Sequence, residues 1–374
     1  MKQGAFKLFT PGPAPLAHRL AAVAQRPLPY NRTAEFSAIT LEILEGLKYL
    51  FDTQGEVVIL TSSGTGGMEA AVASLVAPTD RALVIDAGVF GHRWGELCAF
   101  HGIAADSLSV EPGTPLDIGR LEERLQSGAY NVLLATAHET STGTLYDMAA
   151  CGELAQRCGV LFVVDAISCI GADAFHMDRW HVDAAVLSSQ KALGLPPGLS
   201  FLALSPRSVE RLGKVRPRSM YFDLAEYLRN QVRGQMPYTP AVGLFLLLEE
   251  RLREIRQLGR EAWNALHAER ASHFRGRLGD LPFELFSQCP SQALTALRCR
   301  DGLQAEAIVA ELAEHHGLVV APNGGALKSS VFRVAHLGEQ SLADLDLLID
   351  ALADVVQTIG SITACSVAPC SVTP

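Results

Sequence analysis

An acidic and a basic side chain stand directly after two apolar runs in the middle of the chain. Asp165 ends the run Val163-Val164, where an unpaired carboxylate would be costly to bury, so we expect a cationic group opposite it. A protonated pyridine nitrogen would suit, because the carboxylate would hold its proton in place. Lys191 follows the run that ends at Leu187, and a partly desolvated lysine has a lowered pKa and can form an imine with an aldehyde. Each residue alone also has an ordinary interpretation, a helix cap or salt bridge for the acid and a solvated side chain for the lysine.

A glycine-rich turn supplies a third chemical feature. Residues 61–67 join an apolar run to a helical pattern over 68–76. Backbone N–H groups around Gly64 and the hydroxyls of Ser63 and Thr65 would suit a phosphate dianion at a helix N-terminus. A nicotinamide-binding turn is an alternative, although the turn lacks the spacing of G-x-G-x-x-G and the ending of a P-loop. The phosphate cradle, the acid and the lysine occur in the order that one cofactor would require.

Short apolar runs alternate with helical patterns from residue 56 to 205. The runs are 56–60, 82–86, 131–136, 160–166, 184–188 and 201–204. Strands that are apolar on both faces and separated by helices indicate an α/β fold, with helices on both faces of a mostly parallel sheet. In such sheets ligands bind beyond the carboxyl ends of the strands. The residues discussed above follow such runs.

Four segments divide the chain. Residues 1–20 contain Thr10-Pro11-Gly12-Pro13, which disfavours a helix and predicts an extended arm packed on another surface. We expect a large domain over 21–255 and a smaller C-terminal α/β domain over 256–360. Their boundary lies in or beside a long helical pattern from 241 to 278, and strands are expected near 293–298, 318–321 and 331–335. Residues 361–374 are mostly small or polar and predict a flexible tail.

The composition is that of a globular protein. The 374 residues are 48% hydrophobic and 19% charged, with a formal net charge of −9 at pH 7, so a large core is expected and nucleic acid or an anionic membrane is not an expected partner. No run approaches the roughly 20 apolar residues of a membrane span, and the start of the chain lacks the pattern of a signal peptide. The eight cysteines lack the paired spacing of a zinc site. We therefore predict a cytoplasmic protein without a bound metal.

The motifs together resemble those of class V aminotransferases of fold type I, in particular the alanine-glyoxylate, serine-pyruvate and 2-aminoethylphosphonate-pyruvate transaminases. The similarity runs from Thr10 to about Gly338. Its motifs are Ser63-Gly64-Thr65, Gly88-Val89-Phe90-Gly91-His92-Arg93, His138-Glu139-Thr140-Ser141-Thr142-Gly143, Val164-Asp165-Ala166-Ile167-Ser168, Ser189-Gln190-Lys191 with Pro196-Pro197-Gly198, Tyr238-Thr239-Pro240 and Phe332-Arg333-Val334. The resemblance implies a large domain with a mostly parallel, seven-stranded-type sheet that binds pyridoxal 5'-phosphate (PLP), and a smaller C-terminal α/β domain.

The resemblance also implies roles at the cofactor ring. Lys191 would hold PLP as a Schiff base, and Asp165 would pair with the pyridine nitrogen. Phe90 would stack on one face of the ring, and Ile167 would pack on the other. Thr140 would lie beside the ring hydroxyl.

At the phosphate, the resemblance implies that Gln190 assists the cradle of Ser63, Gly64 and Thr65. Thr239 would reach the phosphate from the neighbouring subunit. We therefore expect a homodimer in which each active site is shared between two subunits.

On the substrate side, Arg333 resembles the arginine that binds the substrate carboxylate, for which a guanidinium fork is geometrically suited. Many members carry a His-Arg pair where this chain has Asn31 and Arg32, and a glycine is common at the position of Ala335. We treat Asn31 and Arg32 as candidate substrate-binding residues. Both departures put the usual substrates of the family in doubt and leave the cofactor motifs intact.

We predict a transaminase that moves an amino group from a small amino acid or amine, such as alanine or serine, to a 2-oxo acid such as pyruvate or glyoxylate. Other PLP reactions on the same fold, catalysed by a lyase, decarboxylase or desulfurase, remain alternatives, as does a donor of the 2-aminoethylphosphonate type. Two alternative hypotheses lie outside the PLP enzymes: a nicotinamide-dependent oxidoreductase and a binding protein without catalytic turnover. The paired acid and lysine argue against both.

Overall fold

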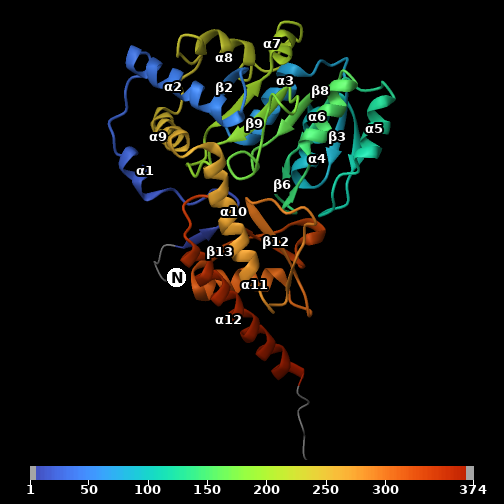
Figure 1. The fold of residues 1–374 in the computed structure, drawn as a ribbon, viewed down its shortest axis with the longest axis vertical. Coiled ribbons are helices and arrows are strands. Elements are labelled where there is room, and N and C mark those ends of the chain that lie inside the picture. Colours follow the sequence, from blue (N-terminus) through green and yellow to red (C-terminus); the bar gives the residue numbers. More distant parts are fainter. Residues whose placement is uncertain (1–5, 368–374) are drawn as a thin grey trace, which may run out of the picture.

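A seven-stranded sheet organises the larger part of the molecule, and the computed structural model describes residues 6–367 (Figure 1). Its strand order is β2-β10-β9-β8-β5-β3-β4. Neighbours from β9 through β8, β5 and β3 to β4 are parallel, whereas β10 is antiparallel to both β2 and β9. This arrangement confirms the predicted α/β fold with a mostly parallel sheet. The strands are β2 Glu56–Leu60, β3 Arg81–Asp86, β4 Ala104–Ser109, β5 Val132–Thr136, β8 Leu161–Asp165, β9 Ala184–Ser188 and β10 Ser200–Leu204.

Each apolar run predicted between residues 56 and 205 forms a strand of this sheet, with ends that agree to within one residue. The strands β5, β8, β9 and β10 are buried along their whole length. Helices cover both faces of such strands, so their positions are apolar or small, except for Asp165 at the end of β8, and the pattern predicts them well.

Helices cover the sheet (Figure 1). Helices α2 and α9 pack on each other, α3 packs on β9 and β10, and α4 packs on β3, β4 and β5. Side-chain oxygens of Thr33, Asp117, Asp147, Ser205 and Asp223 accept hydrogen bonds from first-turn N–H groups and so fix where α2, α5, α6, α7 and α8 begin. The helices are α2 Ala34–Phe51, α3 Gly64–Leu75, α4 Val89–Phe100, α5 Ile118–Gln126, α6 Met148–Arg157, α7 Pro206–Leu212, α8 Leu224–Gln231 and α9 Val242–Leu258.

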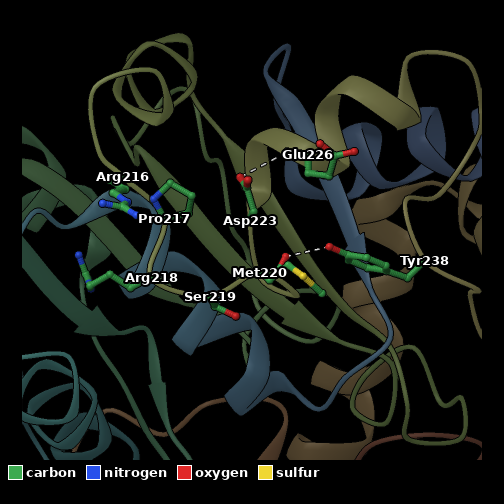
Figure 2. A pocket seen from close by; sticks show the side chains of 8 residues that line it. All are labelled: Arg216, Pro217, Arg218, Ser219, Met220, Asp223, Glu226 and Tyr238. Atoms are coloured by element: carbon green, nitrogen blue, oxygen red, sulfur yellow. Dashed lines mark hydrogen bonds between the residues drawn. The ribbon is translucent and has the colours of Figure 1, made fainter.

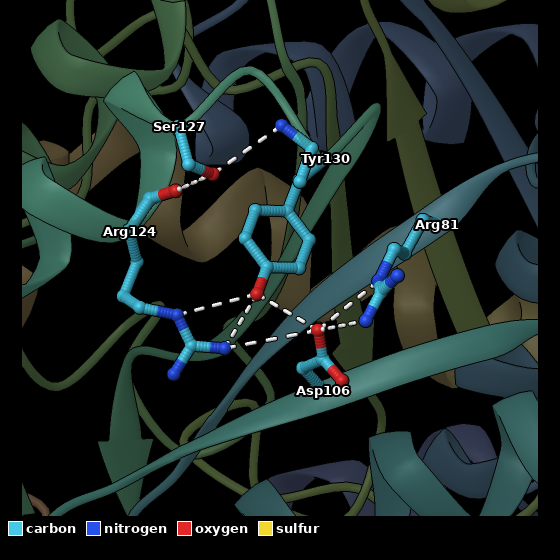
Figure 3. A network of polar contacts seen from close by, with 6 residues as sticks. Arg81, Asp106, Arg124, Ser127 and Tyr130 are labelled. Carbon is cyan, nitrogen blue, oxygen red and sulfur yellow. Dashed lines mark hydrogen bonds and ion pairs between the residues drawn. The ribbon is translucent and has the colours of Figure 1, made fainter.

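The edge strand β4 was not predicted, because most of its residues are polar or exposed and only Leu108 is buried. A polar network ties this strand to its surroundings (Figure 3). Asp106 accepts hydrogen bonds from Arg81 Nη2 and from the Tyr130 hydroxyl, each at 2.8 Å. Arg124 Nε donates to the same hydroxyl at 3.2 Å. Cross-strand polar contacts of this kind leave no apolar period in the sequence.

A second, five-stranded sheet of order β1-β13-β14-β12-β11 forms the smaller part, below the first sheet in Figure 1. Its core contains Phe9, Phe274, Phe332, Leu345 and Leu352, all fully buried. The predicted strands near 293–298, 318–321 and 331–335 are all present. The elements are β1 Lys7–Phe9, α10 Arg260–Arg277, β11 Phe283–Leu285, β12 Leu294–Cys299, α11 Ala305–Glu311, a π-helical turn Leu312–His316, β13 Leu318–Pro322, a 3-10 turn Gly325–Leu327, β14 Val331–Ala335 and α12 Leu342–Val367.

The expected extended arm over residues 1–20 is corrected in one respect. Strand β1 is extended and pairs in parallel with β13, but helix α1 (His18–Val23) begins inside the range. The prolines that disfavour a helix lie at positions 11, 13 and 15, and Leu20 and Val23 beyond them are buried. Residues 1–5 lie outside the described residues.

The expected loose tail from residue 361 is also corrected, because the backbone of α12 is helical as far as Val367; residues 368–374 lie outside the described residues. The helical pattern from 241 to 278 forms two helices separated at Gly259, whose φ of 92° suits glycine. The domain boundary near residue 255 stays a prediction. No helix in the described part of the chain is long and apolar enough to cross a membrane.

Candidate active site

A cavity of about 160 Å³ lies beyond the carboxyl ends of β5, β8 and β9 and at the start of α3. This is the edge of the sheet where the topology predicts ligand binding. The structure brings together nine of the predicted cofactor-binding residues there, and adds Arg93, His138 and Ser168. The predicted residues in its wall are Ser63, Gly64, Thr65, Phe90, Thr140, Asp165, Ile167, Gln190 and Lys191.

Asp165 is the last residue of β8 and is only 4% exposed. Burial raises the pKa of its carboxyl to about 7, while a hydrogen bond from the Ile167 N–H to Oδ1, at 2.9 Å, opposes that rise. A carboxyl group with this environment is ready to be ionised by a cation placed against it. The site therefore provides the partner that a protonated pyridine nitrogen needs.

Lys191 lies in the loop after β9. Burial lowers the pKa of its ammonium group to about 8, the charge of Asp165 opposes that change, and Arg333 and Arg93 add to it. Its Nζ donates to the Pro11 carbonyl at 2.7 Å, so the N-terminal segment passes directly over the lysine. A Cβ on Gly12 would lie 3.1 Å from Nζ. An amine with a pKa near 8 is readily neutral and nucleophilic.

The N-terminus of α3 forms the third wall of the cavity. Ser63 is its N-cap, but the Ser63 side chain makes no capping hydrogen bond. A Cβ on Gly64 would lie 2.5 Å from Ile167 Cδ1, so a larger residue there would require the Ile167 side chain to move. Arg93 Nη1 donates to Thr65 Oγ1 at 3.2 Å and brings a positive charge to this wall. An uncapped helix N-terminus with a nearby guanidinium is a site for a phosphate dianion.

Phe90 stands in the first turn of α4 and is positioned by the fully buried Glu139. Glu139 Oε2 accepts hydrogen bonds from the N–H groups of Phe90 and Gly91, at 3.1 and 3.0 Å, and a carboxylate at a helix N-terminus is stabilising. The Arg93 guanidinium lies 5.0 Å from the centre of the Phe90 ring. Glu139 thus fixes the backbone at Phe90, and Arg93 lies over the Phe90 ring.

His138 and Thr140 share one wall, because they alternate with Glu139 along an extended segment that begins as β6 (His138–Glu139), paired with β7 (Thr144–Leu145). Thr140 Oγ1 donates to Ser168 Oγ at 2.8 Å. No role was predicted for His138 or Ser168, although both lie in motifs of the resemblance. The period of two that places Thr140 at the cavity also places His138 there, and was the signal that could have identified it.

Arg333 is on β14 of the smaller sheet and reaches toward the cavity. Its Nη1 donates to the Thr140 carbonyl at 3.1 Å and its Nη2 to the Pro322 carbonyl at 2.5 Å. Its Nε is buried and has no hydrogen-bond partner among residues 6–367. Burial lowers the pKa of Arg333, and the charge of Glu139 opposes this. A guanidinium held by carbonyls alone keeps its charge available for an anion.

Four predicted site residues are not in the cavity wall of this chain. Arg333 only approaches it, and Asn31, Arg32 and Thr239 lie elsewhere. Asn31 is buried before α2, and Arg32 is exposed, with Nη1 donating to the Met236 carbonyl at 2.7 Å. Thr239 is exposed before α9, next to Tyr238, whose hydroxyl donates to the Met220 carbonyl at 2.9 Å. Figure 2 shows Tyr238 at the rim of a larger, open surface cavity of about 770 Å³ that contains none of the predicted site residues.

Comparisons with known proteins show what the whole chain is similar to. The family model described as aminotransferase class-V matches residues 18–337. The soluble hydrogenase small subunit of Synechococcus sp. (strain PCC 6716) is 32% identical over 94% of this chain and 93% of its own length. The L-aspartate–glyoxylate aminotransferase of Paracoccus denitrificans is 33% identical over 90% and 87% of the two chains. The solved structure of an aspartate aminotransferase of subgroup IV from Thermus thermophilus superposes with a TM-score of 0.87 at 32% identity, over 93% of this chain and 99% of that one.

Proposed function

The chain belongs to the class V aminotransferase family, and from that membership we propose that it uses PLP to move an amino group from a small amino acid or amine to a 2-oxo acid. One observation carries the proposal. Lys191 and Asp165 face the same cavity from the ends of adjacent strands, next to the uncapped N-terminus of α3. These are the partners that an aldehyde, a pyridine nitrogen and a phosphate require.

The cavity lining fits the cofactor. Ser63, Gly64, Thr65 and Gln190 would hold the phosphate, with the bare backbone at Gly64 allowing close approach. Lys191 would carry PLP as a Schiff base. When bound, PLP supplies the carbonyl that takes up the amino group and a ring that withdraws electrons from the substrate carbon.

At the ring, Asp165 would hold the proton on the pyridine nitrogen, because burial already favours pairing this carboxyl with a cation. Phe90 and Ile167 would pack on the two ring faces, and Thr140 would lie beside the ring hydroxyl. Lys191 would also be the general acid and base that moves a proton at the substrate carbon.

Arg333 would bind the carboxylate that donor and acceptor share. Its guanidinium is part-buried and contacts only carbonyl oxygens in the described chain. In transamination two substrates use one site in turn, so a fixed guanidinium fork would orient both against the same cofactor. Asn31 and Arg32 remain predictions, since they lie outside the cavity wall of this chain.

We propose that the active form is a cytoplasmic homodimer with shared sites. Thr239 is exposed and lies away from the cavity of its own chain, which is compatible with a role at the phosphate of the partner subunit. The dimer would also cover exposed apolar side chains such as Met220 and Val89, which are 79% and 54% exposed.

A panel of amino donors tests the function. Purified protein with PLP is incubated with alanine, serine or aspartate and with pyruvate or glyoxylate, and the amino acid formed is quantified. Lys191→Ala serves as the control. We expect a new amino acid from at least one pair and none from the control. If PLP binds but no pair exchanges an amino group, transamination with these donors is contradicted, and a lyase, decarboxylase or other PLP reaction is the next to test. The Synechococcus relative is named as a soluble hydrogenase subunit and not as an aminotransferase. Amino transfer by this chain therefore has to be measured directly.

A further inference from the structure

The turn between β6 and β7, residues 140–143, is held from within by Glu139. The N–H groups of residues 141–143 all donate to Glu139, the first to its carboxylate and the other two to its carbonyl, at 2.9–3.1 Å. Thr140 and Ser141 are buried, so the carbonyl groups of these two residues need donors from another segment.

Both carbonyls receive side-chain donors from the ends of the smaller sheet. Arg333 Nη1 donates to the Thr140 carbonyl at 3.1 Å, and Asn323 Nδ2 donates to the Ser141 carbonyl at 2.7 Å. Asn323 directly follows β13 and is 8% exposed, and its Oδ1 accepts from the Gly324 N–H at 3.1 Å. A buried amide that uses both of its ends has one orientation. Asn323 is therefore a fixed link between the end of β13 and the turn.

The same two segments hold the guanidinium of Arg333. Arg333 pairs with Ala321 in the register of β13 and β14. Its Nη2 donates to the Pro322 carbonyl at the end of β13, and its Nη1 donates to the Thr140 carbonyl in the turn. The guanidinium thus spans from β13 to the turn, and Asn323 joins these segments beside it. The separation that Asn323 fixes is the one across which Arg333 makes both of its contacts.

Arg333 has donors that the protein does not use. A guanidinium has five N–H donors, and two of them donate to the carbonyls named above. The Nε of Arg333 is buried and has no hydrogen-bond partner among residues 6–367. An unpaired buried donor is costly, and a carboxylate that accepts from Nε and a neighbouring Nη would satisfy it. Such a bidentate contact is strict in geometry, so its strength depends on where the guanidinium is placed.

We propose that Asn323 is a positioning residue for the substrate carboxylate. By tying the end of β13 to the Ser141 carbonyl, it places the Arg333 guanidinium where the carboxylate of donor or acceptor binds. The inference rests on the proposed function, because it requires Arg333 to bind that carboxylate. Asn323 is not in the cavity wall and acts through Arg333. It therefore affects the affinity for substrate more than the affinity for the cofactor.

A carboxylate that cannot transfer an amino group tests the proposal without turnover. The PLP-loaded parent, Asn323→Ala and Asn323→Asp are titrated with propionate by calorimetry. Aspartate has the shape of asparagine but has no N–H for the Ser141 carbonyl, so it separates the hydrogen bond from packing. The dissociation constant for propionate should rise about three- to tenfold in Asn323→Ala and at least as much in Asn323→Asp, with little change in PLP affinity.

Asn264→Ala is the matched control. Asn264 lies in α10, and its Nδ2 donates to the Asp173 carbonyl at 3.1 Å. The variant therefore also removes an amide-to-carbonyl hydrogen bond between distant segments, but one that does not involve Arg333 or the turn. It should lower the melting temperature and leave the dissociation constant for propionate unchanged.

Steady-state rates provide a second readout. Asn323→Ala should raise KM for the amino donor and for the oxo acid by similar factors, because both use Arg333, and should change kcat less than KM. Loss of folded enzyme alone would lower the apparent kcat and leave both KM values unchanged.

The outcomes separate this inference from the proposed function. Parent-like propionate affinity and KM values in both Asn323 variants, in a protein whose Arg333→Lys variant binds propionate more weakly, would overturn this inference alone. If the parent does not bind propionate, or Arg333→Lys binds it as tightly as the parent, the carboxylate site is not at Arg333 and the inference fails with that assignment. Absence of amino transfer by the parent would overturn the proposed function, whatever the propionate titrations give.

Discussion

At the level of single residues, the site depends on two ionisable groups that burial shifts in opposite directions. The pKa of Asp165 is raised to about 7 and that of Lys191 is lowered to about 8. Burial therefore brings the pKa of each group close to the neutral range of pH, although their opposite charges attract. Groups with strongly perturbed pKa values that share one cavity are typical of active sites. Burial shifts the pKa values of Asp165 and Lys191 toward neutral pH, which does not happen to a solvent-exposed pair.

Replacing Asp165 tests its role at the ring nitrogen. Asp165→Ala should lower kcat by roughly a hundredfold or more, because the protonated ring loses its stabilising charge, while Asp165→Glu should retain a little activity. Steady-state rates are measured on protein with bound PLP. The matched control is Asp183→Ala, which removes another buried carboxyl with a raised pKa that lies outside the cavity wall. The control should lower the melting temperature and leave kcat per folded enzyme unchanged, and near-normal turnover in Asp165→Ala would refute the assignment.

Arg333→Lys tests the carboxylate site. Lysine retains the charge but loses the guanidinium fork, so KM should rise by about ten- to a hundredfold for both donor and acceptor, with PLP affinity unchanged. The two KM values and a PLP titration are the measurements. If only one substrate is affected, Arg333 binds a distal group and Arg32 becomes the candidate for the shared carboxylate. If neither changes, the donor is not an alpha-amino acid, and an aminoalkylphosphonate becomes the next donor to test.

The predicted residues that the structure brings to the cavity are those whose position follows from a strand end and a known motif, such as Lys191 and Asp165. Arg93 and His138 were missed, although they lie in the same motifs. Their positions at the cavity depend on Thr65 and on Ser168, which the chain brings to them from distant segments. The spacing of motifs along the sequence also could not predict the contact between Lys191 and the Pro11 carbonyl, because these residues are far apart in the chain.

At the level of elements, burial decided what could be predicted. Strands buried on both faces carry a continuous apolar signal, and all of those at the cavity were found. β4 and β11 are mostly exposed, and β1 has only three residues, so their sequences carry little signal. Helix α12 continues past residue 361, where a run of small and polar residues had favoured a loose tail. Small residues permit a helix as readily as a loop when the preceding turns are already helical.

The start of α3 offers a test of the phosphate cradle. In Gly64→Ala the new Cβ would lie 2.5 Å from Ile167 and 3.2 Å from Ser188, so these side chains must move or the helix must shift. We expect PLP to bind roughly ten- to a hundredfold more weakly, since overpacking costs about 1–3 kcal/mol. The dissociation constant for PLP and the melting temperature of the protein without cofactor are measured together.

Gly95→Ala is the matched control for this prediction. Gly95 lies within α4, and a Cβ there meets nothing within 4 Å, so the variant should keep the parent affinity for PLP and gain up to about 1 kcal/mol of stability. Unchanged PLP affinity in Gly64→Ala would mean that this turn does not hold the phosphate.

At the level of the whole molecule, residues from the smaller sheet and its loops contact the cavity wall that the larger sheet provides. Arg333 donates to the Thr140 carbonyl, and Ser291 from the loop before β12 contacts His138. The N-terminal segment runs from β1 in the smaller sheet to the Pro11 carbonyl over Lys191. The sequence predicted every strand of the larger sheet except β4, and β12, β13 and β14 of the smaller sheet. It did not predict this assembly, because the assembly depends on contacts between segments that are far apart in the chain.

Complementation between two inactive variants tests the shared sites of the proposed homodimer. Lys191→Ala removes the Schiff-base lysine, and Thr239→Asp would place a negative charge beside the partner's phosphate. In a mixed dimer one site contains both changes and the other contains neither, so mixing the two inactive proteins under subunit exchange should restore activity. Light scattering gives the oligomeric state. An active monomer, or no recovery in mixed dimers of two folded variants, would count against shared sites.

The central claim is that Lys191 carries PLP, and chemical trapping tests it most directly. The protein is incubated with PLP, reduced with borohydride and digested, and the modified peptide is identified by mass spectrometry. We expect one dominant pyridoxyl adduct on Lys191. It should be lost in Lys191→Ala and unaffected in Lys214→Ala, which removes an exposed lysine paired with Glu210. A dominant adduct on another lysine, or no adduct on a folded protein saturated with PLP, would contradict it.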